Sequence, residues 1–537
     1  MDRRRIQSTS EFARTLSVMQ DARRRLEEIK NYITSKYPAV GHKIIERIST
    51  QDLNNPSFHW YGAKSDFVYH DIHPDIIKAF LSTKKVKKFV LPASRDARER
   101  ALRKNPNRED RVMSYDHIRK YHDALLFGAQ ERGTCMSNLY SIEMKKFLES
   151  YKKEVAAQKK LGKVEEFDSD AFTFPLVRTL CSWFLKSGDV ISWLFLLMQW
   201  NCMARSINID CIGFSNLKRG SDSIIVKYDE TKSDKTGETC SNKHIYGNPA
   251  DPVVCVFLAL GLYSAIEHVS LATRNSLFLK AGATLGSAAK NFCNRLASVI
   301  KKYSDIVASH IRCDRANVHG IRKGGSRHAT SETTCPPSLV SVALRGEWSM
   351  GKVFDIYFKF GSSGDEYLGR ILAGLNPNNA SFACLPPYFT GSITNPHIER
   401  AMKGMFGDIL ENHPSTRSIL SLCLASIVYH SEFLKEIIRN NRGHPLETIF
   451  IFQDESLLQE LKMLVSTQES EMMKPTGIPP HVNQMVVIKE MHNSLHSVIE
   501  KFETQTLTIV NAVKDAIHEN DVQSGVVNLT TLEVNLY

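Results

Sequence analysis

The chain has 537 residues, which is enough for two to four domains that each bury a hydrophobic core. A hydrophobic fraction of 42% and a charged fraction of 24% are those of an ordinary soluble globular protein, and the formal net charge of +11 suits a polyanionic partner without requiring one. The eleven cysteines include no Cys-x-x-Cys pair, which argues against a zinc ribbon or a disulfide framework and fits a reducing, intracellular compartment.

Residues 1–70 form an N-terminal extension that lacks the apolar core of a signal peptide and contains one expected helix, at about 11–35. Residues 71–165 follow as a region of amphipathic helical runs interrupted by a charged linker. Within this region, the segment 84–120 holds thirteen lysines and arginines against five acidic residues. Such a run is most often a solvated helix face. It begins with Lys84, Lys85, Lys87 and Lys88.

An acidic stretch at 165–172 marks the expected start of a third region, 166–390, which opens with two helices at about 171–186 and 189–205. The apolar run inside the second helix is too short to span a bilayer and indicates a buried helix. SDSIIVKYDE and NKHIYGN predict a β-hairpin with its loop around 230–241. A buried helix (DPVVCVFLALGLYSAI), a short strand (SLFLK) and further helices follow, and the paired prolines of LPPYF are expected to close the domain.

The tail, 391–537, is expected to be a separate region with helices near 395–411, 416–440 and 454–467. A last helix at about 486–519 places apolar residues at three- and four-residue spacing, which predicts a short coiled coil that multimerises the protein. The alternative is a helix that packs on its own tail. The whole pattern predicts a mainly α (α+β) protein with a small β-hairpin or sheet.

The segment between His319 and Tyr357 carries the residues on which a function can be argued. His319 and Arg322 lie three residues apart, which places both on one face of a helix. Trp348 follows, Tyr357 comes nine residues later, and Arg205 lies far upstream in a helical context. A tyrosine can attack a phosphodiester, arginines hold the non-bridging oxygens, and histidine or lysine moves protons. These residue types together predict metal-free breakage and rejoining of DNA strands.

Each residue also has a structural interpretation when it is taken alone. Tyr357 has aromatic neighbours that are typical of a core, and Trp348 could equally be a core residue. Arg205 could form a structural ion pair, and the His-x-x-Arg spacing occurs often by chance. The order and spacing of the set are therefore the stronger signal.

The order Arg205, hairpin lysine, His319-x-x-Arg322, Trp348 and Tyr357 resembles the catalytic set of the tyrosine recombinases, the phage integrase family. MARSINID, DETKSDKTGE, HGIRKGGSRHATS, LRGEWSMGKVFDIYFKF and LPPYF are similar to segments of the Crypton-type recombinases of eukaryotic transposons. The resemblance covers roughly residues 175–390.

The resemblance implies a role for each member of the set. Arg205 and Arg322 would clamp the scissile phosphate, and His319 would assist proton movement at the nucleophile. Trp348 stands where many family members have histidine, and its indole N–H can still donate to the phosphate. The remaining implied roles fall on Tyr357, which would form a 3′-phosphotyrosine, and on Lys232, which would protonate the leaving 5′ oxygen, with Lys235 as its rival.

The resemblance further implies a helical core-binding domain at 71–165 and a catalytic domain at 166–390 that grip double-stranded DNA from opposite faces. It also gives the basic run at 84–120 a role in contacting DNA phosphates. The candidates for DNA contact are Lys84, Lys85, Lys87, Lys88, Lys235 and Lys323. The expected assembly is a homo-oligomer, a dimer or tetramer on DNA, without a membrane partner, and the implied compartment is the nucleus. No metal or other cofactor is expected. Two alternatives stay open: a domesticated DNA-binding protein that no longer recombines, and an enzyme that resembles type IB topoisomerases.

Overall fold

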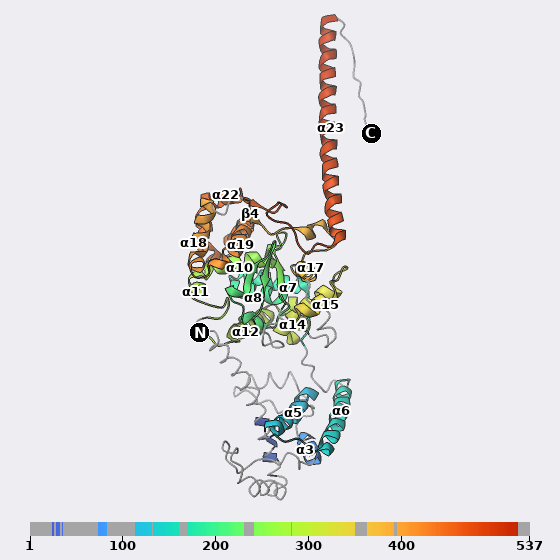
Figure 1. The fold of residues 1–537 in the computed structure, drawn as a ribbon. Coiled ribbons are helices and arrows are strands. Elements are labelled where there is room, and N and C mark those ends of the chain that lie inside the picture. Colours follow the sequence, from blue (N-terminus) through green and yellow to red (C-terminus); the bar gives the residue numbers. More distant parts are fainter. Residues whose placement is uncertain are drawn as a thin grey trace. The chain divides into compact units, whose positions relative to one another are not determined.

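The computed structural model describes residues 74–82, 113–131, 133–160, 169–229, 241–280, 282–348, 362–390 and 395–524, together with a few residues between 24 and 35. The chain divides into two compact units, Met1–Asp168 and Ser169–Tyr537, each with its own core (Figure 1). It is mainly helical, with two small antiparallel sheets among the described residues, so the predicted mainly α class is confirmed.

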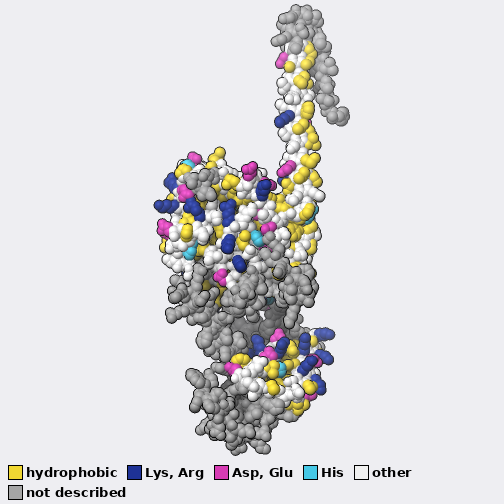
Figure 2. Space-filling view, viewed as in Figure 1, with side chains coloured by type: hydrophobic (Ala, Val, Ile, Leu, Met, Phe, Trp, Pro, Cys, Tyr) yellow, Lys and Arg dark blue, Asp and Glu magenta, His cyan; other side chains and the backbone are white. Residues whose placement is uncertain are grey.

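The first unit contains α3 (Pro74–Ser82), α5 (Tyr115–Glu131) and α6 (Asn138–Lys160). Their buried faces meet in a core that includes Phe80, Tyr121 and Tyr140, as the amphipathic pattern predicted. The opposite faces of α5 and α6 carry exposed Lys and Arg side chains, which appear dark blue in Figure 2. The described part of the predicted 11–35 helix is helical, whereas Lys84, Lys85, Lys87, Lys88 and the charged linker lie outside the described residues.

The core of the second unit is built on two helices that are apolar on every side, α8 (Val190–Asn201) and α10 (Val256–Ile266). Both were predicted as buried helices, and nearly all of their residues are buried. α7 (Phe174–Lys186) packs against α8. The two α8 tryptophans satisfy their indole N–H groups on carbonyls: Trp193 donates to Val253 at 2.7 Å and Trp200 to Leu372 at 2.9 Å. These bonds hold α8 at the centre of the unit.

The predicted hairpin is present as β2 (Ser223–Val226) and β3 (Lys243–Tyr246), which pair antiparallel with Ile224 opposite Ile245. An additional strand, β1 (Leu217–Arg219), pairs with β2 and completes a three-stranded sheet of order β1-β2-β3. Most of the hairpin loop, 230–240, lies outside the described residues.

Three helices after the hairpin agree with predicted ones: α12 (Ser287–Lys302), α14 (Val318–Ser331) and α15 (Leu339–Arg345). Four further helices were not predicted: α9 (Ser206–Asp210), which precedes the sheet, and α11 (His268–Ala272), α13 (Ser304–Ala308) and α17 (Ser362–Leu372), which follow it. Short 3₁₀ turns lie between them, including η6 (Ala380–Ala383). The strand predicted at SLFLK is wrong: the segment is irregular, and Leu277 instead donates its N–H to the Ile212 carbonyl and accepts the Tyr263 hydroxyl.

The separate C-terminal region predicted from residue 391 is also corrected by the structure. α18 (Pro396–Asn412), α19 (Arg417–Tyr429), α20 (Ser431–Asn440), α21 (Phe450–Gln453) and α22 (Glu455–Lys462) share one hydrophobic core with α8 and α10. α19 packs directly on α10, because both present apolar residues around most of their circumference. LPPYF does not end the unit, since its last two residues form β4 (Tyr388–Phe389), which pairs with β5 (Val465–Ser466).

The last helix, α23 (Pro480–Ser524), has 45 residues and exceeds the predicted 486–519 at both ends. No helix among the described residues combines the length and the apolar character that crossing a membrane would require.

Candidate functional site

Arg205 lies at the turn between α8 and α9. α8 ends at Asn201 and is capped by Cys202, and Met203 adopts a left-handed backbone with φ of 47°, which turns the chain shortly before Arg205. Arg205 then caps α9 with an extended backbone, and its carbonyl accepts the N–H of Asn208 at 2.9 Å. Its side chain is half-buried, and its Nη1 is buried with no hydrogen-bond partner.

Arg322 lies on α14, whose position is fixed by close backbone contact. A Cβ atom on Gly320 would lie 2.3 Å from the carbonyl oxygen of Asp170, and one on Gly324 would lie 2.2 Å from that of Phe172. Only glycine allows the helix to approach this segment so closely. Arg322 is thereby held in the interior with 3% of its surface exposed.

The guanidinium of Arg322 makes two contacts with the segment that follows α15. Its Nη2 donates to the carbonyl of Gly346, and its Cζ lies 5.5 Å from the ring centroid of Trp348. Trp348 itself is 40% exposed, so it is not a plain core residue. The Nη1 of Arg322 is buried and, like that of Arg205, has no hydrogen-bond partner.

The charges of the two arginines act on each other. Burial, and to a smaller extent the positive charge of Arg205, lower the pKa of Arg322 to about 10, while Glu347 and Tyr228 act in the opposite direction. Arg322 stays charged at neutral pH. Two neighbouring guanidinium groups that each keep a buried, unused donor form an environment that favours an anion with several oxygen acceptors.

Glu347 supports this arrangement from the same short segment. Its carboxylate accepts from Lys243 Nζ at 3.0 Å and from Asn208 Nδ2 at 3.3 Å. Its backbone has a φ of 54°, a left-handed conformation that costs a non-glycine residue about 1 kcal/mol or more. The ion pair with Lys243, whose side chain is fully buried, fixes the position of the Glu347 side chain.

Arg345 anchors the end of α15, directly before Gly346. Its fully buried guanidinium donates to Asp365 Oδ1 at 2.6 Å, to the Asn201 carbonyl at 2.9 Å and to the His244 carbonyl at 2.9 Å. The bonds join α15 to α17, α8 and β3. The segment that holds Trp348 against Arg322 therefore starts from a rigid point.

The structure brings together part of the predicted set. Trp348 lies against Arg322, and Arg205 is near enough for its charge to lower the pKa of Arg322. His319 lies on the exposed first turn of α14, three residues before Arg322, where its backbone N–H donates to Asn317 Oδ1. The Nζ of Lys323 donates to the Ser169 carbonyl at 3.1 Å, so the chain itself uses part of its donor capacity. Three predicted residues, Lys232, Lys235 and Tyr357, lie outside the described residues.

Sequence reasoning missed Glu347, Lys243 and Asn208. The carboxylate directly before Trp348, in the stretch GEW, and the position of Asn208 three residues after Arg205 are signals that could have indicated them. Lys243 gave no such signal, because a lysine at the start of a strand is usually exposed.

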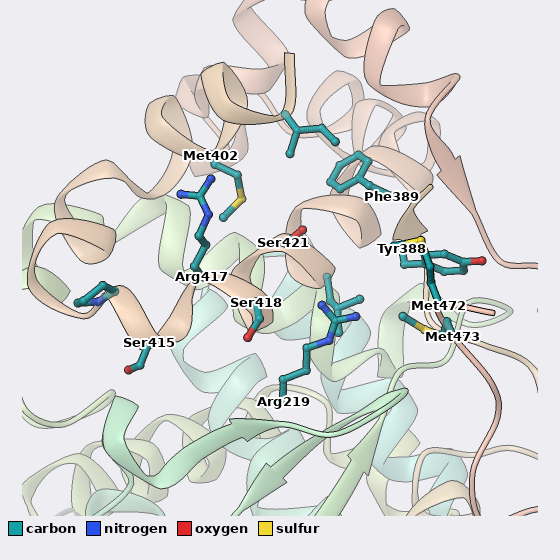
Figure 3. A pocket seen from close by; sticks show the side chains of 13 residues that line it. Arg219, Tyr388, Phe389, Met402, Ser415, Arg417, Ser418, Ser421, Met472 and Met473 are labelled. Atoms are coloured by element: carbon teal, nitrogen blue, oxygen red, sulfur yellow. The ribbon is translucent and has the colours of Figure 1, made fainter. Parts of the chain in front are cut away.

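A cavity of about 270 Å³ lies elsewhere in the second unit, lined by residues of β1, β4, α18 and α19. Figure 3 shows Arg219 and Arg417 in its wall, on either side of Ser418. Arg417 is paired with Glu399, and the rest of the lining is largely apolar. The cavity contains no residue of the predicted set and is distinct from the arginine pair.

Comparison with known proteins identified no relative of this chain. The chain matches no model of a known protein family and no curated protein sequence. The argument for a function therefore depends on the residues and their arrangement.

Proposed function

We propose that the chain is a tyrosine-type DNA strand transferase, a site-specific recombinase or transposase with a tyrosine-recombinase-like fold. The observation that supports this most is the pair Arg205 and Arg322, each with a buried Nη1 that lacks a partner. A phosphodiester offers two non-bridging oxygens, and two guanidinium groups can bind both. The exposed Trp348 beside Arg322 and the His319-x-x-Arg322 spacing agree with this chemistry.

In the proposed reaction, the hydroxyl oxygen of Tyr357 attacks the scissile phosphorus and the bond from phosphorus to the 5′ oxygen breaks. His319 assists the departure of the phenolic proton, and Lys232, or its rival Lys235, gives a proton to the leaving 5′ oxygen. The product is a 3′-phosphotyrosine and a free 5′-hydroxyl. The 5′-hydroxyl of another strand then attacks the phosphotyrosine and releases Tyr357, which completes an exchange that needs no external energy source.

The arginine pair is suited to the transition state of this reaction. Negative charge on the equatorial oxygens increases as the phosphorus becomes five-coordinate, and donors that are already in place stabilise that charge without reorganisation. The mutual repulsion of the arginines, which contributes to the lowered pKa of Arg322, is relieved when an anion binds between them. The proposed partner is double-stranded DNA, the proposed assembly is a homo-oligomer on it, and the proposed compartment is the nucleus.

A nicked suicide DNA substrate tests the proposal, because loss of a short strand after cleavage traps the covalent intermediate. The native protein is expected to give a protein–DNA adduct that survives denaturation, and Tyr357→Phe is expected to give none. Tyr429→Phe, which alters an exposed tyrosine on α19, is the matched control and should give the native yield.

The other outcomes decide between the alternatives. DNA binding without any adduct would identify a binding protein that has lost recombination. An adduct without strand exchange between two duplexes would identify an enzyme of the topoisomerase type. An adduct that persists in Tyr357→Phe would overturn the assignment of the nucleophile.

A further inference from the structure

α23 carries a long, uncovered apolar stripe. Only its beginning is anchored: Val482 is buried, and the Nε2 of His481 lies 3.1 Å from the Pro377 carbonyl oxygen. Every described side chain from Val487 to Asp515 is exposed. Hydrophobic side chains, yellow in Figure 2, follow one side of the helix. Isolated helices gain little stability from their own backbone, so such a face is expected to be covered in the functional protein.

The stripe follows a seven-residue repeat. Ile488, Leu495, Phe502 and Ile509 are spaced by seven residues and are each 60–65% exposed. Met491 and Val498 occupy the second position of the same repeat, which continues through Gln505 to Ala512. A repeat of 3.5 residues per turn, rather than 3.6, is kept along one face when two or more helices supercoil around each other. The spacing therefore favours a coiled coil over docking on a flat surface.

The charges of α23 indicate what the partner is. The two positions of the repeat that begin with Ile488 and Met491 form the seam of the coiled coil. Residues next to the seam select partners in coiled coils, and between residues 487 and 515 Lys501 and Asp515 are the only lysine, arginine or acidic residues at these neighbouring positions. The other charged residues of this stretch lie away from the seam. In a parallel, in-register pair of identical helices, Lys501 would face Thr506 of the second copy, so no like charges meet. A second copy of the same chain is therefore compatible with every position along the seam.

Gln505 indicates how the two helices are aligned along their length. It is the one polar residue among the seam positions between Ile488 and Ala512. An amide is both donor and acceptor, so Gln505 can bond to Gln505 of another copy when the helices are parallel and aligned. A buried polar residue of this kind fixes register and orientation at some cost in stability.

The apolar area is sufficient for a stable association. Nine large apolar side chains lie on or beside the seam between Val487 and Val513, and each is 43–67% exposed. At about 60–100 Å² each, they present roughly 500–900 Å² per chain. A dimer would bury about 1,000–1,800 Å² in total, which is the range of stable protein interfaces.

We infer that α23 joins copies of this chain in a parallel, in-register coiled coil along the Ile488–Ile509 seam. The inference is independent of the proposed DNA chemistry, because it depends only on α23. Light scattering on the full chain at micromolar concentration tests it. The native protein is expected to have a mass of at least twice the 60.8 kDa of one chain. The double variant Leu495→Asp, Phe502→Asp is expected to be monomeric.

Leu507→Asp is the matched control, because Leu507 is 63% exposed on the same helix but lies opposite the seam. It should leave the native mass unchanged. A native monomer, or an oligomer that tolerates the double seam variant, would overturn the inference. An oligomer lost equally in Leu507→Asp would overturn the seam assignment.

Orientation is tested by oxidative cross-linking of Met491→Cys, with the native protein as background for its own cysteines. A parallel, aligned seam places the two introduced thiols opposite each other and should give a disulfide-linked dimer well above background. Oligomers that show no such cross-link would overturn the parallel register.

Discussion

The Nζ of Lys243 lies 3.0 Å from Oε1 of Glu347, and both side chains are almost completely removed from solvent. This ion pair ties the first residue of β3 to the residue between Gly346 and Trp348, both of which contact Arg322. A charge pair buried in this way contributes little net stability, but removal of one partner leaves the other without compensation. The pair therefore maintains the shape of the segment that faces the arginines.

A double-mutant cycle on this pair should show strong coupling. Glu347→Gln keeps an acceptor for Asn208 but leaves the buried ammonium group of Lys243 without its carboxylate, and it should lower the free energy of unfolding by about 3 kcal/mol or more. Lys243→Met combined with Glu347→Gln should cost clearly less than the sum of the single changes. Urea unfolding of the three variants measures this. Additive costs would show that the pair is not energetically coupled.

Arg205→Ala should reduce formation of the covalent DNA adduct by about 10²–10³-fold, the usual effect of removing a preorganised donor from a developing negative charge. Arg322→Lys should have a similar effect, because lysine keeps the charge but cannot bond to the Gly346 carbonyl and to a phosphate in the same geometry. DNA affinity, measured separately by fluorescence anisotropy, should change by less than tenfold. An equal loss of affinity and cleavage would assign the arginines to binding alone.

Trp348 offers a test of the indole N–H. Trp348→Phe keeps an aromatic ring beside Arg322 but removes the donor, and it should lower the rate of adduct formation by about 10²-fold. Trp348→His supplies a donor again and should retain most of the rate. Single-turnover cleavage of the suicide substrate measures both. A native rate in Trp348→Phe would mean that the indole acts only by stacking on Arg322.

The two arginines could be proposed from the sequence, but the ion pair between Lys243 and Glu347 could not. Arg205, Arg322 and Trp348 could be proposed because their order and spacing along the chain resemble a known catalytic set. Lys243 and Glu347 are 104 residues apart, and nothing local distinguishes a buried lysine in a strand from an exposed one. Only the tertiary structure shows that they are paired.

The fold shows the same division between local and long-range information. α8 and α10 could be predicted because apolar residues on every side require a buried helix. LPPYF was interpreted as an end because prolines interrupt regular structure, yet its last residues pair with β5, more than seventy residues away. The SLFLK segment has the composition of a strand. Its Leu277, however, forms single hydrogen bonds with Ile212 and Tyr263 and does not pair with a neighbouring strand.

His430 gives the second unit a predicted sensitivity to acid. It lies between α19 and α20 with 7% of its surface exposed, and its Nε2 is buried without a hydrogen-bond partner. Burial lowers its pKa to about 4, against the weaker, opposing effect of Asp251. In the unfolded chain the pKa is near 6.5, so the unfolded state binds the proton first as the pH falls. Titration of His430 therefore leaves the free energy of unfolding unchanged above about pH 6.5 and lowers it progressively between pH 6.5 and 4.

His430→Gln should therefore reduce the loss of stability on acidification. Between pH 7.5 and pH 5, titration of His430 lowers the free energy of unfolding of the native protein by up to about 2 kcal/mol, and this decrease is absent in the variant. Urea unfolding followed by tryptophan fluorescence measures the difference, since four of the five tryptophans lie in the second unit. Burial also lowers the pKa of His328 in the same unit, so the variant keeps a smaller acid dependence. An identical loss of stability in the native protein and the variant would show that His430 is not the titrating group.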